Sequence, residues 1–498
     1  TTLRCPITTY TGDGGALTRL RRGAPLVDLP GIGQARADIS KAWALADGRV
    51  TGMPLEVLIL GLDDGSTYTP LLWGRGPAPD LPGFTLDWTP VPMTPFVSQD
   101  DGTMTTLVRL AIPGSPTNTI VVRVSPSGNR TLYRYGFDPL HRPSTYFAAS
   151  GDIPRIASNA AGACVFTGGL FNPNFRGIGV LYADEQGACV VVDPTTPLPA
   201  PASGGSVQNV LSPPCINDAG EVAFIANVTG YGTALFRWTP LGGLSVAVGA
   251  TFSVPAFGPG ISARINEASV LALSGSSDIL LGVRLTGAGV TAGNDTALVL
   301  WRSGGISPVC REGDEVQGRP GVLFGEHASF SSYAYLNARG QVLFRCATAS
   351  QARTGVGVFA WSRGSGLRTL ALHDEQIEFD GGLEPVNRFP APNFLQFGNF
   401  WLHTSGGQDG RLSMLTEDGV AVIPIAFGST GERWGLYRYE LAPPCPPDFN
   451  GDDFLDFFDV IGFVEAFERG DPEADYNHDG FPDFMDYVDF LTAWEAGC

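Results

Sequence analysis

The sequence predicts a mainly β protein: a β-propeller of about seven four-stranded blades, closed by strands from both ends of the chain, and then a small α-helical domain. Three observations predict this fold. An Asn-x-x-Gly turn recurs with an apolar strand after it. The 498 residues include 65 Gly and 39 Pro, which is typical of short strands joined by tight turns. A twelve-residue acidic pattern occurs twice near the C-terminus. We therefore expect the propeller at 1–441, a Pro-rich linker at 442–447 and the small domain at 448–498.

The predicted blades follow from the turn motif. Clear copies, each an Asn, two residues, a small residue and an apolar strand, begin at Asn159, Asn217, Asn266 and Asn337. One strand precedes each turn and three follow it. The third strand recurs at 234–238, 297–301 and 356–361, and a fourth is clearest at 367–372. Looser copies at 46–48, 99–102 and 394–439 bring the number of units to seven.

The two ends of the array predict how the ring closes. The segment from Leu20 to Gly31 is similar to the segment from Leu72 to Gly83, which ends a unit. The chain is therefore expected to begin with the outer strand of a blade whose other strands lie near Trp434–Tyr439. Closing a ring in this way removes free strand edges. A pair of β-sandwiches and an open solenoid are the alternative architectures.

Composition and charge restrict the classes of partner. The chain is 43% hydrophobic and 16% charged, which is typical of a globular protein. Its net charge is −19, and residues 445–498 carry −14 of it, with 15 Asp or Glu and one Arg. A nucleic-acid partner is not expected, because no basic patch is present to meet phosphate. No apolar run reaches the roughly 18 residues of a membrane span.

The acidic pattern has the spacing of a calcium loop. Oxygen ligands fall at positions 1, 3, 5, 9 and 12 of each twelve-residue loop, and position 7 would contribute a backbone carbonyl. In the first loop the ligands are Asp448, Asn450, Asp452, Phe454, Asp456 and Asp459. In the second loop they are Asp475, Asn477, Asp479, Phe481, Asp483 and Asp486. The sequence thus predicts two bound Ca²⁺ ions, which would offset about four negative charges.

Each loop runs into an amphipathic helical pattern, at 457–468 and at 484–495. Phe463 and Phe490 occupy matching positions. The stability of a core this small is marginal, so calcium and a covalent link are expected to stabilise it.

Cys445 and Cys498 flank the repeat, and we expect them to form a disulfide in an oxidising compartment. The alternative is that they stay reduced or pair elsewhere. Because the chain begins at Thr1 without an apolar leader, we expect a signal peptide to have been removed and the protein to be extracellular or on the cell surface.

The duplicated Asp-x-Asn-x-Asp loop and helix, with the flanking cysteines and the terminal Gly497-Cys498, resembles a GC-type, type I-like dockerin over residues 445–498. The Asn-x-x-Gly strands resemble the tandem repeats that often precede such modules in secreted bacterial proteins. Dockerins bind cohesin modules, so the resemblance implies docking to a cohesin-like or other surface protein. Loop positions 10 and 11, which often hold Ser and Thr in cellulosomal dockerins, here hold Phe457, Phe458, Phe484 and Met485. They predict an apolar docking surface, unless these side chains fill the small core.

Catalytic motifs are not found in the sequence. It has five His and contains no HExxH or GxSxG motif. Three functional hypotheses follow. The chain is a surface-attached binding or structural protein, an enzyme acting on polysaccharide through the propeller, or a self-assembling protein whose C-terminal domain docks on another copy to form a homopolymer. We favour calcium-dependent attachment without catalysis.

Overall fold

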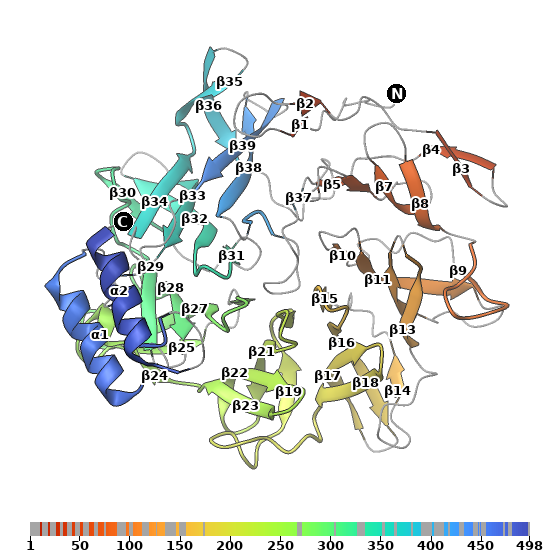
Figure 1. Cartoon of the computed structure of the whole chain (residues 1–498), viewed down its shortest axis with the longest axis horizontal. Coiled ribbons are helices and arrows are strands. Elements are labelled where there is room, and N and C mark those ends of the chain that lie inside the picture. Colours follow the sequence, from red (N-terminus) through yellow and green to blue (C-terminus); the bar gives the residue numbers. More distant parts are fainter. Residues whose placement is uncertain are drawn as a thin grey trace.

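The structure is a computed structural model of the whole chain (Figure 1). It describes residues 76–86, 103–111, 119–134 without 126, 156–172, 175–265, 271–302, 305–325, 334–350, 354–362, 366–379, 382–389, 413–427 without 417 and 418, 433–441, 447, 449, 455–471, 474–476 and 481–496, together with further strands whose bounds are given below.

Seven sheets of four to six strands are formed by the described residues, and Figure 1 shows them following one another in sequence order around a common centre. This arrangement is that of a β-propeller. The first sheet contains β5 (Ala42–Ala44), β6 (Val50–Gly52), β7 (Ile59–Asp63), β8 (Tyr68–Trp73) and β37 (Trp401–Leu402). The second contains β9 (Thr85–Leu86), β10 (Phe96–Ser98), β11 (Met104–Ala111), β12 (Thr119–Val124) and β13 (Arg130–Arg134), and the third β14 (Tyr146–Ala148), β15 (Ile156–Ser158), β16 (Cys164–Asn172), β17 (Phe175–Asp184) and β18 (Gly187–Val192).

The fourth sheet contains β19 (Val207–Val210), β20 (Cys215–Ile216), β21 (Val222–Val228), β22 (Gly232–Thr239) and β23 (Gly243–Val248). The fifth contains β24 (Phe252–Ser253), β25 (Ser262–Ile265), β26 (Leu271–Leu273), β27 (Ile279–Thr286), β28 (Thr296–Arg302) and β29 (Gly305–Arg311), with the 3₁₀ helix η2 (Pro255–Phe257) between β24 and β25. The sixth contains β30 (Val322–Phe324), β31 (Ala334–Leu336), β32 (Val342–Ser350), β33 (Thr354–Ser362) and β34 (Gly366–Leu372), and the seventh β35 (Gln376–Phe379), β36 (Gly382–Arg388), β38 (Val420–Phe427) and β39 (Arg433–Glu440). Two separate pairs, β1 (Tyr10–Thr11) with β2 (Thr18–Arg19) and β3 (Leu26–Leu29) with β4 (Gly33–Arg36), lie nearer the N-terminus.

The third to sixth sheets follow the predicted plan of one strand leading into the turn and three after it. In the fourth sheet, β20 leads through the turn into β21, and β22 and β23 follow as antiparallel neighbours. A further strand, β19, pairs with the other half of β21. The strands β15, β20, β26 and β31 contact one another in that order, so they form the inner layer of successive sheets.

The Asn of each turn links its own sheet to the next one. The Asn217 side chain accepts a hydrogen bond from the N–H of Glu221 (3.0 Å) and donates one to the carbonyl of Ser274 (3.2 Å). Asn159 donates in the same way to the carbonyl of Asn217 (3.0 Å), and Asn337 to that of Thr416 (3.0 Å). A side-chain amide has both an acceptor and a donor, which explains why the turn uses Asn.

The third copy of the turn lies eight residues beyond the predicted Asn266–Ser269, at Ser274–Ser277. Ser274 occupies the Asn position and accepts from the N–H of Asp278 (3.0 Å). Ser277 takes the place of the turn glycine and has a φ of 67°, close to the 77° of Gly220. The predicted segment at 266–269 lies outside the described residues. The serine replacements removed the Asn-x-x-Gly pattern that guided the sequence prediction.

Ring closure differs from the prediction in the part of the chain that the structure describes. The last strand, β39, pairs only with β38 there, and no N-terminal strand joins it. The two ends of the chain are linked by another pair, because β37 runs parallel to β5 and places Trp401 opposite Trp43. A strand of two residues carries too little periodicity to be recognised in a sequence.

The core lies mainly between neighbouring sheets. One buried cluster combines Val165, Val180 and Val192 of the third sheet with Phe224 and Phe236 of the fourth. The rings of Phe224 and Phe236 stack at 5.4 Å between centroids. Such apolar contacts on both faces hold successive sheets together.

Two helices follow the sheets, as the sequence predicts: α1 (Phe457–Arg469) and α2 (Phe484–Ala496). Gly470 ends α1 in the left-handed conformation, with φ 66° and its N–H bonded to helix carbonyls. Neither helix has the length and apolar character needed to cross a membrane, and this holds for every helix among the described residues. We call residues 445–498 the C-terminal module.

Candidate functional site

Helix α1 begins with two carboxylates supplied by the first acidic loop. Asp456, at loop position 9, accepts a hydrogen bond through Oδ1 from the N–H of Phe458 (2.8 Å). Asp459, at position 12, accepts through Oδ2 from the N–H of Asp456 (2.8 Å). The pair forms a capping box, in which negative side chains satisfy the unpaired N–H groups of the first helical turn.

Helix α2 begins with the same arrangement. Asp483 accepts through Oδ1 from the N–H of Met485 (2.7 Å), and Asp486 accepts through Oδ2 from the N–H of Asp483 (2.6 Å). The repeat in the sequence is therefore also a repeat in local structure. The two halves are tied together, since the indole N–H of Trp494 on α2 donates to the carbonyl of Asp456 (3.1 Å).

The carboxylates at position 12 are fully enclosed in the module. Asp459 and Asp486 both have 0% exposure. Burial of a carboxylate is costly unless hydrogen bonds or a cation compensate for the lost water. The module has 15 Asp or Glu and a single arginine, Arg469. Its guanidinium binds Asp471 (2.9 Å) and lies 3.9 Å from Glu465. Its positive charge is therefore used in ion pairs at the C-terminal end of α1.

The donor set of the loops fits a hard divalent cation. Carboxylates, amide oxygens and a backbone carbonyl are the ligands that Ca²⁺ takes, and the predicted ligand positions include neither sulfur nor imidazole. The enclosed carboxylates and the excess of negative charge suit an ion of charge +2. Bound there, the ion would hold the loop against the start of its helix through Asp459 or Asp486.

Half of the predicted ligands belong to the described residues: Asp456, Asp459, Asp475, Phe481, Asp483 and Asp486. The other half, Asp448, Asn450, Asp452, Phe454, Asn477 and Asp479, lie outside them, as do both cysteines of the predicted disulfide, Cys445 and Cys498. Within the described residues alone, no three His, Cys, Asp or Glu side chains form a complete metal-binding group. The described half includes positions 9 and 12 of both loops and, in the second loop, positions 1 and 7.

The module has an aromatic core. Phe463 and Phe490 are fully buried, and Ala466 and Ala474 join them. Phe449, from the first loop, packs edge-on against Phe463 (5.3 Å, 82°). Burial raises the pKa of Tyr476, next to this core, and the nearby Asp489 carboxylate raises it further.

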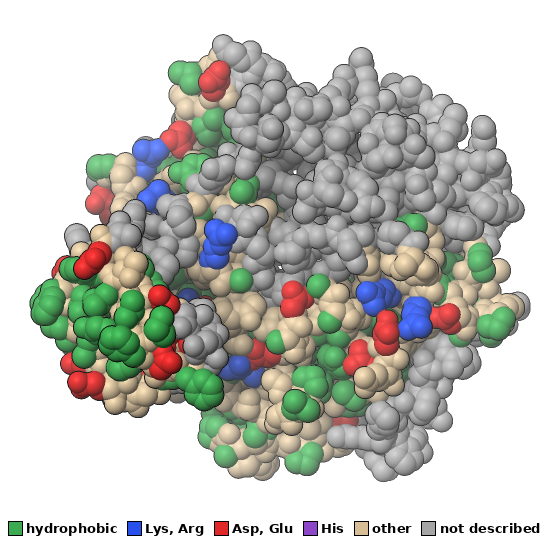
Figure 2. All heavy atoms as spheres, viewed as in Figure 1, with side chains coloured by type: hydrophobic (Ala, Val, Ile, Leu, Met, Phe, Trp, Pro, Cys, Tyr) green, Lys and Arg blue, Asp and Glu red, His purple; other side chains and the backbone are tan. Residues whose placement is uncertain are grey.

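The side chains at loop positions 10 and 11 do not fill this core. Phe457, Phe458, Phe484 and Met485 are 55–70% exposed. Figure 2 shows hydrophobic side chains gathered over α1 and α2, with Asp and Glu along the border of the patch. The sequence left open whether these residues pack inside or face a partner, and the structure places them on the surface.

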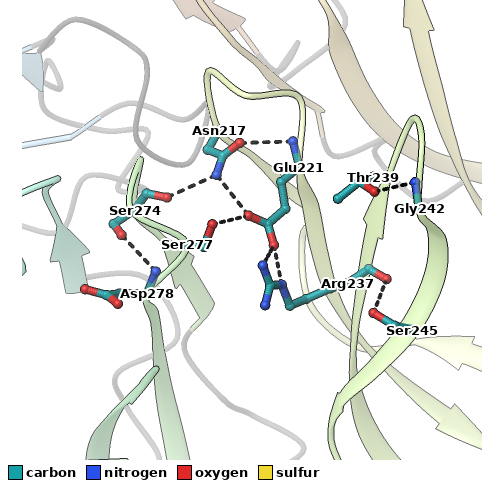
Figure 3. Close-up of polar contacts among 9 residues, drawn as sticks. All are labelled: Asn217, Glu221, Arg237, Thr239, Gly242, Ser245, Ser274, Ser277 and Asp278. Atoms are coloured by element: carbon teal, nitrogen blue, oxygen red, sulfur yellow. Dashed lines mark hydrogen bonds and ion pairs between the residues drawn. The ribbon is translucent and has the colours of Figure 1, made fainter. Parts of the chain in front are cut away.

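A second polar cluster lies where the fourth and fifth sheets meet (Figure 3). Glu221 is 4% exposed, and its carboxylate accepts from Ser277 Oγ (2.5 Å) and Asn217 Nδ2 (3.2 Å). It also forms an ion pair with Arg237, whose guanidinium lies over the Trp301 ring at 5.4 Å from its centroid. Three contacts cross to the fifth sheet, from Ser277 to Glu221, from Asn217 to the Ser274 carbonyl and from Arg237 to the Trp301 ring, so the cluster holds the two sheets together.

Sequence reasoning missed this cluster, although a signal was present. The fourth residue after the turn Asn or its replacement is polar in three copies: Glu221, Asp278 and Gln341. In the sixth sheet Gln341 accepts from Asn337 (2.8 Å), and in the fifth Asp278 pairs with Arg302 (2.8 Å). A polar residue that recurs among apolar ones, just before a buried strand, indicates a satisfied contact at a fixed place in the fold.

Comparison with known families places the chain in a family. Residues 89–430 match a family of unknown function, DUF7453. The chain belongs to this family. The match covers most of the sheets of the DUF7453 protein and ends before the C-terminal module. No curated protein matches the chain.

Solved structures similar to the DUF7453 protein share little sequence with it. The GH93 α-L-arabinofuranosidase of Fusarium graminearum, in complex with arabinobiose, is 12% identical with a TM-score of 0.31, covering 70% of this chain and 92% of its own. The β-propeller domain of the Trilobed protease from Pyrococcus furiosus is 9% identical with a TM-score of 0.33, covering 73% and 92%. YCF48 bound to D1 peptide is 11% identical with a TM-score of 0.32, covering 84% and 97%.

Proposed function

We propose that the chain is an extracellular attachment protein whose C-terminal module binds two Ca²⁺ ions and docks on a partner, in the manner of a dockerin. The observation that carries this proposal is the structural duplication. Asp456 with Asp459, and Asp483 with Asp486, make the same capping bonds and present the same buried carboxylate at position 12. Capping a helix requires only the residues at its start. Two calcium sites require two complete twelve-residue acidic loops, which is what the sequence has.

The cation has a defined place in this proposal. The oxygen atoms of loop positions 1, 3, 5, 7, 9 and 12 hold it, and its charge offsets the crowding of carboxylates in the module. With the ions bound, both loops are fixed against α1 and α2, and the exposed apolar side chains keep a defined arrangement. A disulfide between Cys445 and Cys498 would close the module at its base. Calcium and a disulfide both suit an extracellular setting.

The propeller is the part that the module attaches. We propose that each of the seven larger sheets is one blade, and that the ring recognises a ligand or takes its place in an assembly. The partner of the module is a cohesin-like or other surface protein, or the propeller of another copy. The alternative of an enzyme acting on polysaccharide has no support from a described residue, and likeness at TM-scores near 0.3 carries no argument for an activity.

Calorimetric titration of the chelator-treated full chain with CaCl₂ tests the proposal. We expect binding of two ions. Asp459→Asn and Asp486→Asn keep an oxygen for the capping bond but remove a charged ligand, so each variant is expected to lose or weaken one site. Glu468→Gln, on the exposed side of α1, is the matched control and should keep both sites. An absence of calcium binding by the unmodified chain would refute the proposal.

A further inference from the structure

An apolar face covers the starts of both helices. We define it by Phe457, Phe458, Ile461, Phe481, Phe484, Met485 and Val488, whose exposed fractions run from 37% to 74%. Among the described residues, 12 large hydrophobic side chains are exposed, and these seven all belong to the C-terminal module. The other five are Phe84, Leu241, Leu323, Leu383 and Tyr439, which lie far apart in the sequence. A concentration of this kind marks a surface that another molecule covers.

The apolar face is built twice from the same positions. Phe457 corresponds to Phe484, Phe458 to Met485, and Ile461 to Val488, each pair 27 residues apart. Within each helix the first and third of these residues are four positions apart, as Phe457 and Ile461 are in α1. They are therefore one turn apart and lie on the same side of the helix. Each repeat thus contributes three apolar side chains at equal depth in its helix.

Acidic side chains border the apolar face. Glu465 and Glu468 continue along the exposed side of α1, and Asp489 and Glu495 along that of α2. Figure 2 shows the red carboxylates at the edge of the green patch. The module has a formal charge of −14, and two bound Ca²⁺ ions would bring it to −10. A surface that fits this face must therefore bring positive charge to its rim.

Another copy of the chain is a poor source of that charge, because residues 1–444 carry the remaining −5 of the net −19 and the module carries −14. Two modules meeting face to face would place like charges together, which opposes association. Six arginines of the described sheets are already in ion pairs within the chain: Arg123 and Arg130 with Glu185, Arg237 with Glu221, Arg284 with Asp295, Arg302 with Asp278, and Arg319 with Glu375. Docking that used these six side chains of a second copy would have to break their pairs.

We infer that the apolar face binds a separate protein whose own docking surface is an apolar patch bordered by lysine or arginine side chains. The apolar centre supplies the buried area, and the charged rim sets orientation and excludes acidic surfaces. This inference rests on the proposed docking function and adds the chemistry of the partner.

Two synthetic amphipathic helical peptides serve as probes, one of leucine and lysine and one of leucine and glutamate with the same apolar pattern. Fluorescence anisotropy with the full chain in calcium measures their affinities. We expect the lysine peptide to bind at least about tenfold more tightly than the glutamate peptide. The double variant Phe458→Ser/Met485→Ser leaves the charge unchanged and should weaken that binding by a similar factor. Leu383→Ser, at a 70% exposed position in β36, is the control and should have no effect.

A second pair of measurements separates the possible failures. Glu468→Gln/Glu495→Gln should reduce the preference for the lysine peptide without loss of calcium binding. Sedimentation velocity in calcium should show a monomer at micromolar concentration. The inference would be overturned by any of three results. The two peptides could bind with equal affinity, the double variant could bind the lysine peptide as tightly as the unmodified chain, or the chain could self-associate and lose that self-association in the double variant. If the unmodified chain binds no calcium, the proposed function fails instead.

Discussion

The rings of Phe463 and Phe490 stack with their centroids 4.1 Å apart and their planes 2° apart. The two residues hold equivalent positions in α1 and α2, and both have 0% exposure. Their contact joins the two repeats at the centre of the module. The same duplication that places carboxylates at both helix starts therefore also supplies the core between the helices.

Phe490→Ala should destabilise the module strongly. Removal of a buried aromatic ring costs about 3–5 kcal/mol, which is a large share of what so small a core can supply. Unfolding followed by the fluorescence of Trp494 and the other tryptophans would reveal an early transition in the variant. Phe458→Ala, at a 65% exposed position, should change the free energy of unfolding by less than about 0.5 kcal/mol. Equal effects of the two changes would mean that the ring stack does not hold the module together.

Calcium removal should melt the module before the sheets. The loops crowd carboxylates that the ions would offset, while the sheets have extensive apolar clusters between neighbours. Differential scanning calorimetry with excess calcium and with a chelator should show one transition that moves to lower temperature and one that stays. Magnesium, which prefers a smaller octahedral site, should restore the first transition less well. Superimposable traces would contradict a structural role for the ion.

The sequence predicted elements whose pattern is dense and local. Both helices, and the third strands ending in Trp238, Trp301 and Trp361, lie where expected, because periodicity and turn residues define them within a few positions. It failed where a turn has lost its usual residues and where distant segments pair. Ser274 replaces the turn Asn by hydrogen-bonding to Asp278, and β37 joins β5 across most of the chain. The exposure of Phe458 also depends on what else fills the core, which one sequence does not determine.

Asn217→Ala should loosen the contact between the fourth and fifth sheets. The Asn217 side chain is fully buried and makes three hydrogen bonds, to Glu221 twice and to the Ser274 carbonyl. Their removal leaves buried partners unsatisfied, so we expect a loss of about 2–3 kcal/mol in urea unfolding. Ser245→Ala, which removes one exposed hydrogen bond at 3.3 Å, is the control and should cost much less. A loss no greater than that of the control would show that the turn does not need its amide.

Glu221→Gln should cost more than the same change in an exposed ion pair. The Glu221 and Arg237 side chains are 5% and 24% exposed, whereas those of Glu375 and Arg319 are 28% and 41% exposed. An uncompensated guanidinium near the interior is expensive, so about 2–3 kcal/mol is expected at Glu221 and less than about 1 kcal/mol for Glu375→Gln. A double-mutant cycle with Arg237→Met measures the coupling between the pair. Coupling near zero would mean that Trp301 alone positions the arginine.

Tyr182 should make the fold sensitive to alkaline pH. Burial, together with the neighbouring Asp184 carboxylate, raises the pKa of its phenol from 10.0 to about 12. The unfolded chain therefore loses this proton at lower pH than the folded chain. Stability from Tyr182 is unaffected below pH 10 and falls as the pH rises from 10 towards 12, by up to about 3 kcal/mol. Tyr182→Phe has no proton to lose, so its unfolding free energy should decline less over that range in urea titrations at fixed pH. The absorbance of ionised tyrosine, measured against pH in both folded proteins, gives the titration of Tyr182 as the difference between them. We expect this difference to be centred near pH 12. A difference centred at pH 10 would contradict the burial of this ring.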